Sequence, residues 1–159
     1  PLFEAYGRLT DPPPLILMGT RNTDTPSNFP SGVHVFYSVP HPTVMAAWDR
    51  SLFGVAPSIL PEPLGNVVHE AMSRGKPVIG TYPGGMGDMI VDGESGLLVP
   101  AGDVTSLAGA MELLLGDPCL RDRLGSRARE HAARFTAAEV LPQIEQLYHD
   151  VLAQHRRAA

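Results

Sequence analysis

The sequence predicts an α/β fold in which helices flank a parallel sheet. Short apolar runs of strand length alternate with segments of helical spacing, which is typical of this class. A cluster of Gly, Pro, Ser or Asn follows each apolar run, at the place where ligands bind in open α/β sheets. The expected strands are residues 15–18, 33–36, 53–56, 77–80 and 96–99.

Helices are expected between and after these strands. In the helix expected at 66–74, Asn66 is placed as the cap, and Gly75 and Pro77 end the helix. Asp117 and Pro118 stand in the order of N-cap and first helical residue. Pro142 should open or kink the last helix, which carries an apolar stripe. The other expected helices are 2–9, 44–48, 104–115, 117–124 and 137–152.

Length and composition indicate one globular domain over residues 1–159. The hydrophobic fraction is 43%, which argues against disorder, and the net charge of −5 gives no footprint for nucleic acid. The single cysteine, Cys119, excludes an internal disulfide and a cysteine-based zinc site within this chain. A reducing, cytoplasmic setting fits best, and membrane association would have to come from other parts of a longer protein. No apolar run approaches the roughly 18 residues that span a bilayer.

The stretch 57–80 is the most informative part of the chain. It follows an expected strand and enters a helix through a turn that contains Gly65. Backbone N–H groups near Gly65, Asn66 and Val67 should therefore point outward with the helix dipole behind them. This arrangement favours an anion or a polyol.

Two carboxylates, Glu62 and Glu70, flank this turn. A carboxylate accepts hydrogen bonds without donating, so each suits the paired hydroxyls of a ribose or a hexose. The alternative is structural, because an acidic residue near a helix start stabilises it by roughly 0.3–1 kcal/mol without any ligand. Spacing alone leaves both interpretations open.

The same stretch resembles the glutamate, seven residues, glutamate signature of the family-4 glycosyltransferases, which have the GT-B fold. Pro57-Ser58 precedes Glu62, Gly65-Asn66 follows it, and Glu70-Ala71-Met72 leads to Gly75-Lys76-Pro77-Val78. The resemblance covers nearly the whole chain, including Gly84-Gly85 and the run 96–100. It implies a Rossmann-like, C-terminal donor domain of a retaining enzyme that needs no metal ion and no cofactor besides its nucleotide-diphosphate sugar.

The resemblance also implies roles for single residues. Glu62 is the expected catalytic residue and lies near the donor sugar, and Glu70 holds the nucleotide ribose. Backbone groups of the Gly-Asn turn meet the sugar or the diphosphate, and the loop 37–40 borders the base. Asp88 departs from the usual glutamate. The expected substrate-binding residues are Glu70, Gly65, Asn66, Val67, Leu64, Ser38, Val39, Gly84 and Gly85.

The family pattern further implies that parts of the working enzyme lie outside this sequence. An Arg and a Lys that clamp the diphosphate have no match near Pro1, and the acceptor-binding domain has none either. We therefore expect the isolated chain to be inactive. The first central strand of the sheet also has no match, so we expect another copy of the chain or a separate fragment to fill its place.

Two other functions stay open. One is a noncatalytic nucleotide-binding or scaffolding module of the same fold. The other is a sugar-nucleotide epimerase or a phosphorylase, which rests on fold analogy alone.

Overall fold

The computed structural model describes residues 1–63 and 65–158 and has the predicted α/β architecture. Its strands pair in parallel throughout, in the register Leu15↔Val33, Gly54↔Val78 and Val78↔Gly96. Every expected strand is present, with ends that differ by at most two residues from those predicted. The strands are β1 (Leu15–Gly19), β2 (Val33–Tyr37), β3 (Gly54–Ala56), β4 (Val78–Tyr82) and β5 (Gly96–Pro100).

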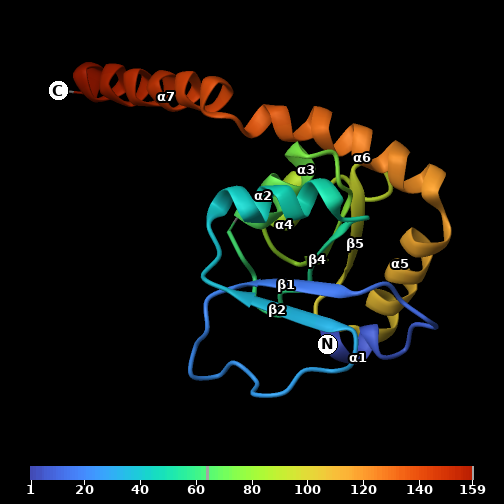
Figure 1. The fold of residues 1–159 in the computed structure, drawn as a ribbon. Coiled ribbons are helices and arrows are strands. Elements are labelled where there is room, and N and C mark those ends of the chain that lie inside the picture. Colours follow the sequence, from blue (N-terminus) through green and yellow to red (C-terminus); the bar gives the residue numbers. More distant parts are fainter. Residues whose placement is uncertain (64, 159) are drawn as a thin grey trace.

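The strands form two separate sheets. One has the order β1-β2 and the other the order β3-β4-β5, and Figure 1 shows the two sheets running in different directions. Among the residues that the structure describes, no strand pairing joins the two sheets. The sheet is therefore interrupted, in agreement with the expectation that its first central strand has no match in this chain.

Helices cover both faces of the three-stranded sheet. Successive side chains of a strand point to opposite faces of the sheet. Val78 and Ile79 on β4 therefore belong to two different hydrophobic cores, one on each face. Ile79 packs with α1 (Leu2–Tyr6) and α5 (Val104–Gly116). Val78 packs with α3 (Asn66–Ser73), α4 (Met86–Met89) and the end of α6 (Pro118–Ala132). This layering leaves the carboxyl ends of β3 and β4 free to carry a site.

Several helical expectations need correction, and the first is that α1 ends at Tyr6 rather than at residue 9. Helix α2 spans His41–Arg50 and therefore begins three residues before the expected start, since Pro42 fits the first turn of a helix. Helix α4 was not expected, because its four residues are too few to show a period. Helix α6 continues to Ala132 rather than 124, because small residues bury its inner face where no large apolar residue marks it. Asp117 caps α6, with Pro118 as the first helical residue, as predicted.

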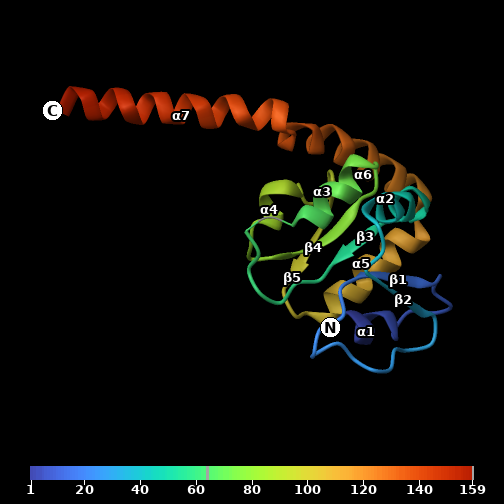
Figure 2. The same ribbon diagram turned by 60° about the vertical axis from the view of Figure 1, so that its left-hand side comes forward.

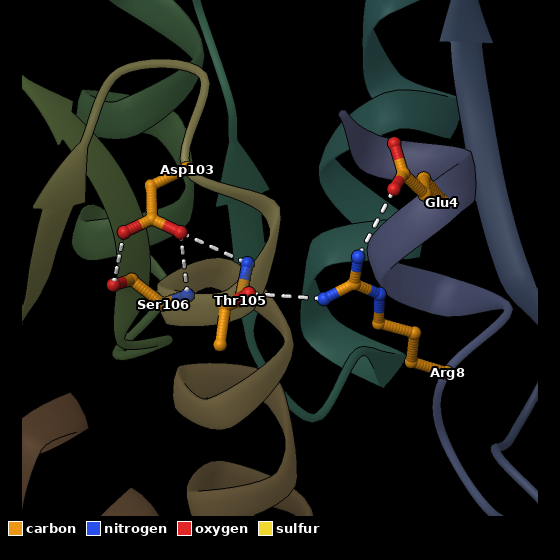
Figure 3. Close-up of polar contacts among 5 residues, drawn as sticks. All are labelled: Glu4, Arg8, Asp103, Thr105 and Ser106. Carbon is orange, nitrogen blue, oxygen red and sulfur yellow. Dashed lines mark hydrogen bonds and ion pairs between the residues drawn. The ribbon is translucent and has the colours of Figure 1, made fainter.

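Helix α5 begins at a cap that also joins it to α1. The Asp103 carboxylate accepts from the backbone N–H groups of Thr105 and Ser106 and from the Ser106 hydroxyl, at 2.7–3.0 Å (Figure 3). These hydrogen bonds, above all the one from the Ser106 hydroxyl, lower the pKa of Asp103 below its usual 3.8. Arg8 donates to Thr105 Oγ1 and to Glu4 on α1, each at 3.0 Å.

Helix α7 (Ala137–Ala158) follows a short 3₁₀ turn, η1 (Ala133–Phe135), and projects from the body of the molecule (Figures 1 and 2). Pro142 lies inside α7, so it does not open the helix. Four members of the predicted apolar stripe are exposed, as expected, namely Ile144, Leu147, Tyr148 and Val151, whereas the fifth, Val140, is half-buried. Within the described residues, no helix is long and apolar enough to cross a membrane.

Candidate functional site

The turn after β3 carries Glu62 in an exposed position. The Ser58 hydroxyl donates to Glu62 Oε1 at 2.6 Å. The backbone oxygen of Ser58 in turn accepts from the hydroxyl of Thr81 on β4 at 2.7 Å. Thr81 is 6% exposed, so β4 holds the base of the turn while the Glu62 carboxylate remains open to solvent.

The glycine pair after β4 packs directly against this turn. The Gly85 N–H donates to the backbone oxygen of Glu62 at 2.7 Å. A β-carbon on Gly85 would overlap the carbonyl oxygen of Pro63, and Gly84 has a φ of +154° that other residues rarely adopt. The structure therefore brings the predicted residues Glu62, Gly84 and Gly85 together, and it explains why both glycines lack side chains.

Helix α3 begins beside the same turn. Its N-cap is Gly65, whose carbonyl accepts from the N–H groups of Val68 and His69, so the expectation that Asn66 caps the helix was wrong by one residue. Among the residues that the structure describes, no side chain donates or accepts a capping hydrogen bond at the start of this helix. The first N–H groups of a helix have no partner within it, so those of Asn66 and Val67 are available to a ligand. The predicted site residue Leu64 lies outside the described residues.

Glu70 lies further along α3, and residues of α2 hold its carboxylate. His41 Nε2 is 3.1 Å from Glu70 Oε1, and the Trp48 indole N–H donates to Oε2 at 3.4 Å. The Glu70 side chain is 24% exposed. Both of its oxygens therefore have a partner on one helix, while one side of the carboxylate remains accessible.

The predicted loop 37–40 leads directly into α2. Ser38 has a φ of +53° and its N–H donates to Gly19 at the end of β1. Non-glycine residues seldom adopt this left-handed conformation, and active-site loops are among the places where they do. Val39 is half-buried. Because His41 follows two residues later and contacts Glu70, this loop and Glu70 belong to the same region.

A cavity of about 770 Å³ opens between the two sheets. Its lining is mostly apolar and includes Ile16 on β1 and Val55 on β3. Val67 and Glu70 also border it, so the cavity reaches the start of α3.

Sequence reasoning missed His41 and Trp48 as members of the site. From the sequence alone, a single histidine such as His41 is expected to be packed or on the surface, and an aromatic such as Trp48 to lie in a core or an interface. The available signal was their spacing of seven residues, which places both on one face of a helix. The expected helix began at 44, so it excluded His41.

The described residues contain no group of three or more His, Cys, Asp or Glu side chains that could hold a metal ion. Asp88, where a glutamate was expected, is exposed on α4.

Comparison with known proteins identifies the family of this chain. A D-inositol 3-phosphate glycosyltransferase of Corynebacterium glutamicum is 37% identical over 112 residues, which make up 70% of this chain and 27% of that protein. An N-acetyl-alpha-D-glucosaminyl L-malate synthase of Bacillus anthracis is 40% identical over 92 residues, 57% of this chain and 24% of that protein. The chain thus spans about a quarter of the length of these curated relatives.

Solved structures agree in fold. Sucrose-phosphate synthase from Thermosynechococcus elongatus matches 96% of this chain and 42% of its own, with a TM-score of 0.84 and 28% identity. HepE of Anabaena in complex with UDP-glucose matches 94% of this chain and 44% of its own, with a TM-score of 0.81 and 24% identity. The family model of glycosyl transferases group 1 matches residues 28–131. The chain therefore belongs to the group 1 glycosyl transferase family and has the fold of a C-terminal GT-B domain.

Proposed function

We propose that this chain is the donor-binding domain of a retaining glycosyltransferase, which moves a sugar from a nucleotide-diphosphate sugar to an acceptor. The observation that carries the proposal is the arrangement around α3. Glu62, before the helix, meets the glycine pair after β4, and Glu70, on the helix, meets His41 directly after the loop 37–40. Ligands of open α/β sheets bind at such strand ends.

In this proposal each predicted residue has a chemical role. Glu70 accepts hydrogen bonds from ribose hydroxyls, and Glu62 lies near the transferred sugar. The N–H groups of Asn66 and Val67, together with the Gly65 turn, face the sugar or the diphosphate at a helix N-terminus. Ser38 and Val39 border the base, and Gly84 and Gly85 shape the sugar pocket around the Glu62 turn.

We further propose that transfer needs no metal ion and that the isolated chain is inactive. The leaving diphosphate must be neutralised and the acceptor positioned, and we assign both tasks to parts of the enzyme beyond these residues. The coverage of about a quarter of the curated relatives supports this division of labour. The single exposed cysteine suits a cytoplasmic location.

The gap between the sheets supports the proposal that one more parallel strand lies between β1 and β3. The cavity between the sheets measures about 770 Å³. A strand from a second copy or a separate fragment would satisfy the backbone groups at both open edges. Sedimentation of the purified chain tests self-association, and a monomer that stays unpaired at high concentration would contradict that route.

Thermal unfolding with UDP, GDP and ADP, each with and without an attached sugar, tests the donor site. We expect one nucleotide to raise the melting temperature, and Glu70→Ala to abolish the shift. Glu112→Gln, an exposed glutamate on α5, is the matched control and should keep it. Stabilisation that survives Glu70→Ala would contradict the assigned role. A chain indifferent to all three nucleotides would favour the noncatalytic module instead.

A further inference from the structure

Two side chains on one face of α2 hold the Glu70 carboxylate. His41 and Trp48 are seven residues apart, which is close to two helical turns, so they lie one above the other on the same face. His41 contacts Oε1 at 3.1 Å and Trp48 donates to Oε2 at 3.4 Å. An ionised carboxylate cannot donate, so His41 Nε2 must carry the proton in this contact.

The position of Trp48 is fixed by the strand beneath it. A β-carbon on Gly54 of β3 would lie 3.2 Å from one ring atom of Trp48 and 3.3 Å from another. The indole ring therefore packs closely against the bare backbone of β3 and is half-buried. His41 is 68% exposed, so the two partners of Glu70 differ: one is a packed anchor and the other is open to solvent.

The remaining hydrogen-bonding capacity of Glu70 matches a pair of neighbouring hydroxyls. A carboxylate has about four lone-pair sites, two on each oxygen. His41 occupies one site on Oε1 and Trp48 occupies one on Oε2, which leaves one site on each oxygen. Two adjacent acceptor sites fit a vicinal diol, because each hydroxyl donates to its own oxygen.

We propose that His41 and Trp48 are positioning residues that orient Glu70 so that both of its oxygens receive the two ribose hydroxyls of the donor nucleotide. This inference rests on the proposed function and deepens it. In this arrangement Glu70 binds the ribose through both carboxylate oxygens. The two α2 residues that hold Glu70 then determine how well the site distinguishes ribonucleotides from deoxyribonucleotides.

Nucleotide titration measures this discrimination. We compare UDP with 2′-deoxy-UDP, and GDP and ADP with their 2′-deoxy forms, by calorimetry on the wild-type chain. The loss of one hydrogen bond to a charged group should weaken binding about tenfold or more. In Trp48→Phe and His41→Ala the ratio should fall to below about threefold, because the carboxylate is no longer held for two hydroxyls. His41→Gln keeps an N–H donor and should restore most of the ratio. His34→Ala, an exposed histidine on β2, is the matched control and should leave it unchanged.

The outcomes separate this inference from the proposed function. If Glu70→Gln removes the discrimination while the His41 and Trp48 variants keep it, the positioning role is overturned and the ribose site stands. If the wild-type chain binds none of these nucleotides, both are overturned.

A measurement without any nucleotide gives a second readout. Trp48 is the single tryptophan, so its indole N–H gives one unambiguous NMR signal. We expect Glu70→Gln to shift this signal, and Glu112→Gln to leave it in place. An indole signal that is insensitive to Glu70→Gln would overturn the anchoring contact.

Discussion

Glu62 and Glu70 differ in what surrounds their carboxylates. Glu62 is exposed on a turn and receives a hydrogen bond from the Ser58 hydroxyl. Glu70 is 24% exposed and has a partner on each oxygen. Under the proposed function, Glu62 therefore suits contact with the transferred sugar, and Glu70 suits contact with the ribose of the nucleotide.

Under the proposed function, this difference predicts separate kinetic effects on sugar transfer by the intact parent protein. Glu62→Gln should lower sugar transfer about 100-fold or more, because an interaction with developing charge is lost. It should change nucleotide affinity less than about threefold, since the ribose contact is elsewhere. Steady-state kinetics and calorimetry check both numbers, with Glu112→Gln as control. Equal losses of transfer and nucleotide affinity would contradict the separation of roles.

Asp103 predicts a dependence of stability on pH. Hydrogen bonds, led by the one from the Ser106 hydroxyl, lower the pKa of Asp103 in the folded state. A lowered pKa means that Asp103 contributes its stabilisation fully above the unfolded value of 3.8, and loses it as pH falls through the folded value. Asp103→Ala should thus lower the melting temperature by about 2–4 °C at pH 7. The difference from wild type should shrink below pH 3.8.

Melting curves of both proteins between pH 2 and pH 7 give the comparison. Asp122→Ala, an exposed aspartate on α6, is the control. A deficit of Asp103→Ala that is the same at every pH would show that the cap does not depend on ionisation.

At the residue scale, some contacts of the candidate site follow from the positions of strand ends and others do not. The contact between the Glu62 turn and Gly84-Gly85 follows from residues at the ends of neighbouring strands. The contacts of Glu70 with His41 and Trp48 depend on where α2 begins and on how it lies over β3. Both features depend on tertiary structure, so no local sequence pattern predicts them.

At the scale of elements, a close backbone approach joins α6 to the turn after α3. A β-carbon on Gly125 would overlap the carbonyl oxygen of Gly75. Gly75 itself has a φ of +71°. Arg129 also donates to the carbonyl of Arg74 at 3.0 Å in the same contact. Gly125 therefore lets α6 lie directly on this turn.

Gly125→Ala should lower the free energy of unfolding by about 1–3 kcal/mol, because the helix must shift to make room. Gly109→Ala on α5 meets no atom within 4 Å and should instead raise it by about 0.5–1 kcal/mol through helix propensity. Urea unfolding of both variants gives the comparison. Equal effects of the two substitutions would show that α6 does not pack this closely.

The strands could be predicted because buried parallel strands are continuous apolar runs with clear punctuation. Helix α4 could not, because its four residues Met86–Met89 include a glycine and show no period. The length of α6 was underestimated because its buried positions beyond Leu124 are Gly125, Ala128 and Ala132. Small residues serve close packing, and a search for large apolar residues passes over them.

At the scale of the whole molecule, two cores hold the body together and α7 lies outside both. Its apolar residues Leu147 and Tyr148 are 62% and 67% exposed. Removal of residues 143–159 should therefore change the free energy of unfolding by less than about 0.5 kcal/mol. Calorimetry of the shortened chain checks this, and a large loss of stability would show that α7 packs on the body in solution.

The two sheet edges that face the cavity have a consequence for the exchange of amide hydrogens with solvent. β4 has a neighbour on each side, whereas β1 and β3 each face the cavity along one edge. Alternate amides of β1 and β3 should thus exchange rapidly, while those of β4 exchange only when the three-stranded sheet opens. Hydrogen–deuterium exchange followed by NMR would show this alternation along Leu15–Gly19. If this alternation disappears when a further strand binds between β1 and β3, the two sheets have become one continuous sheet.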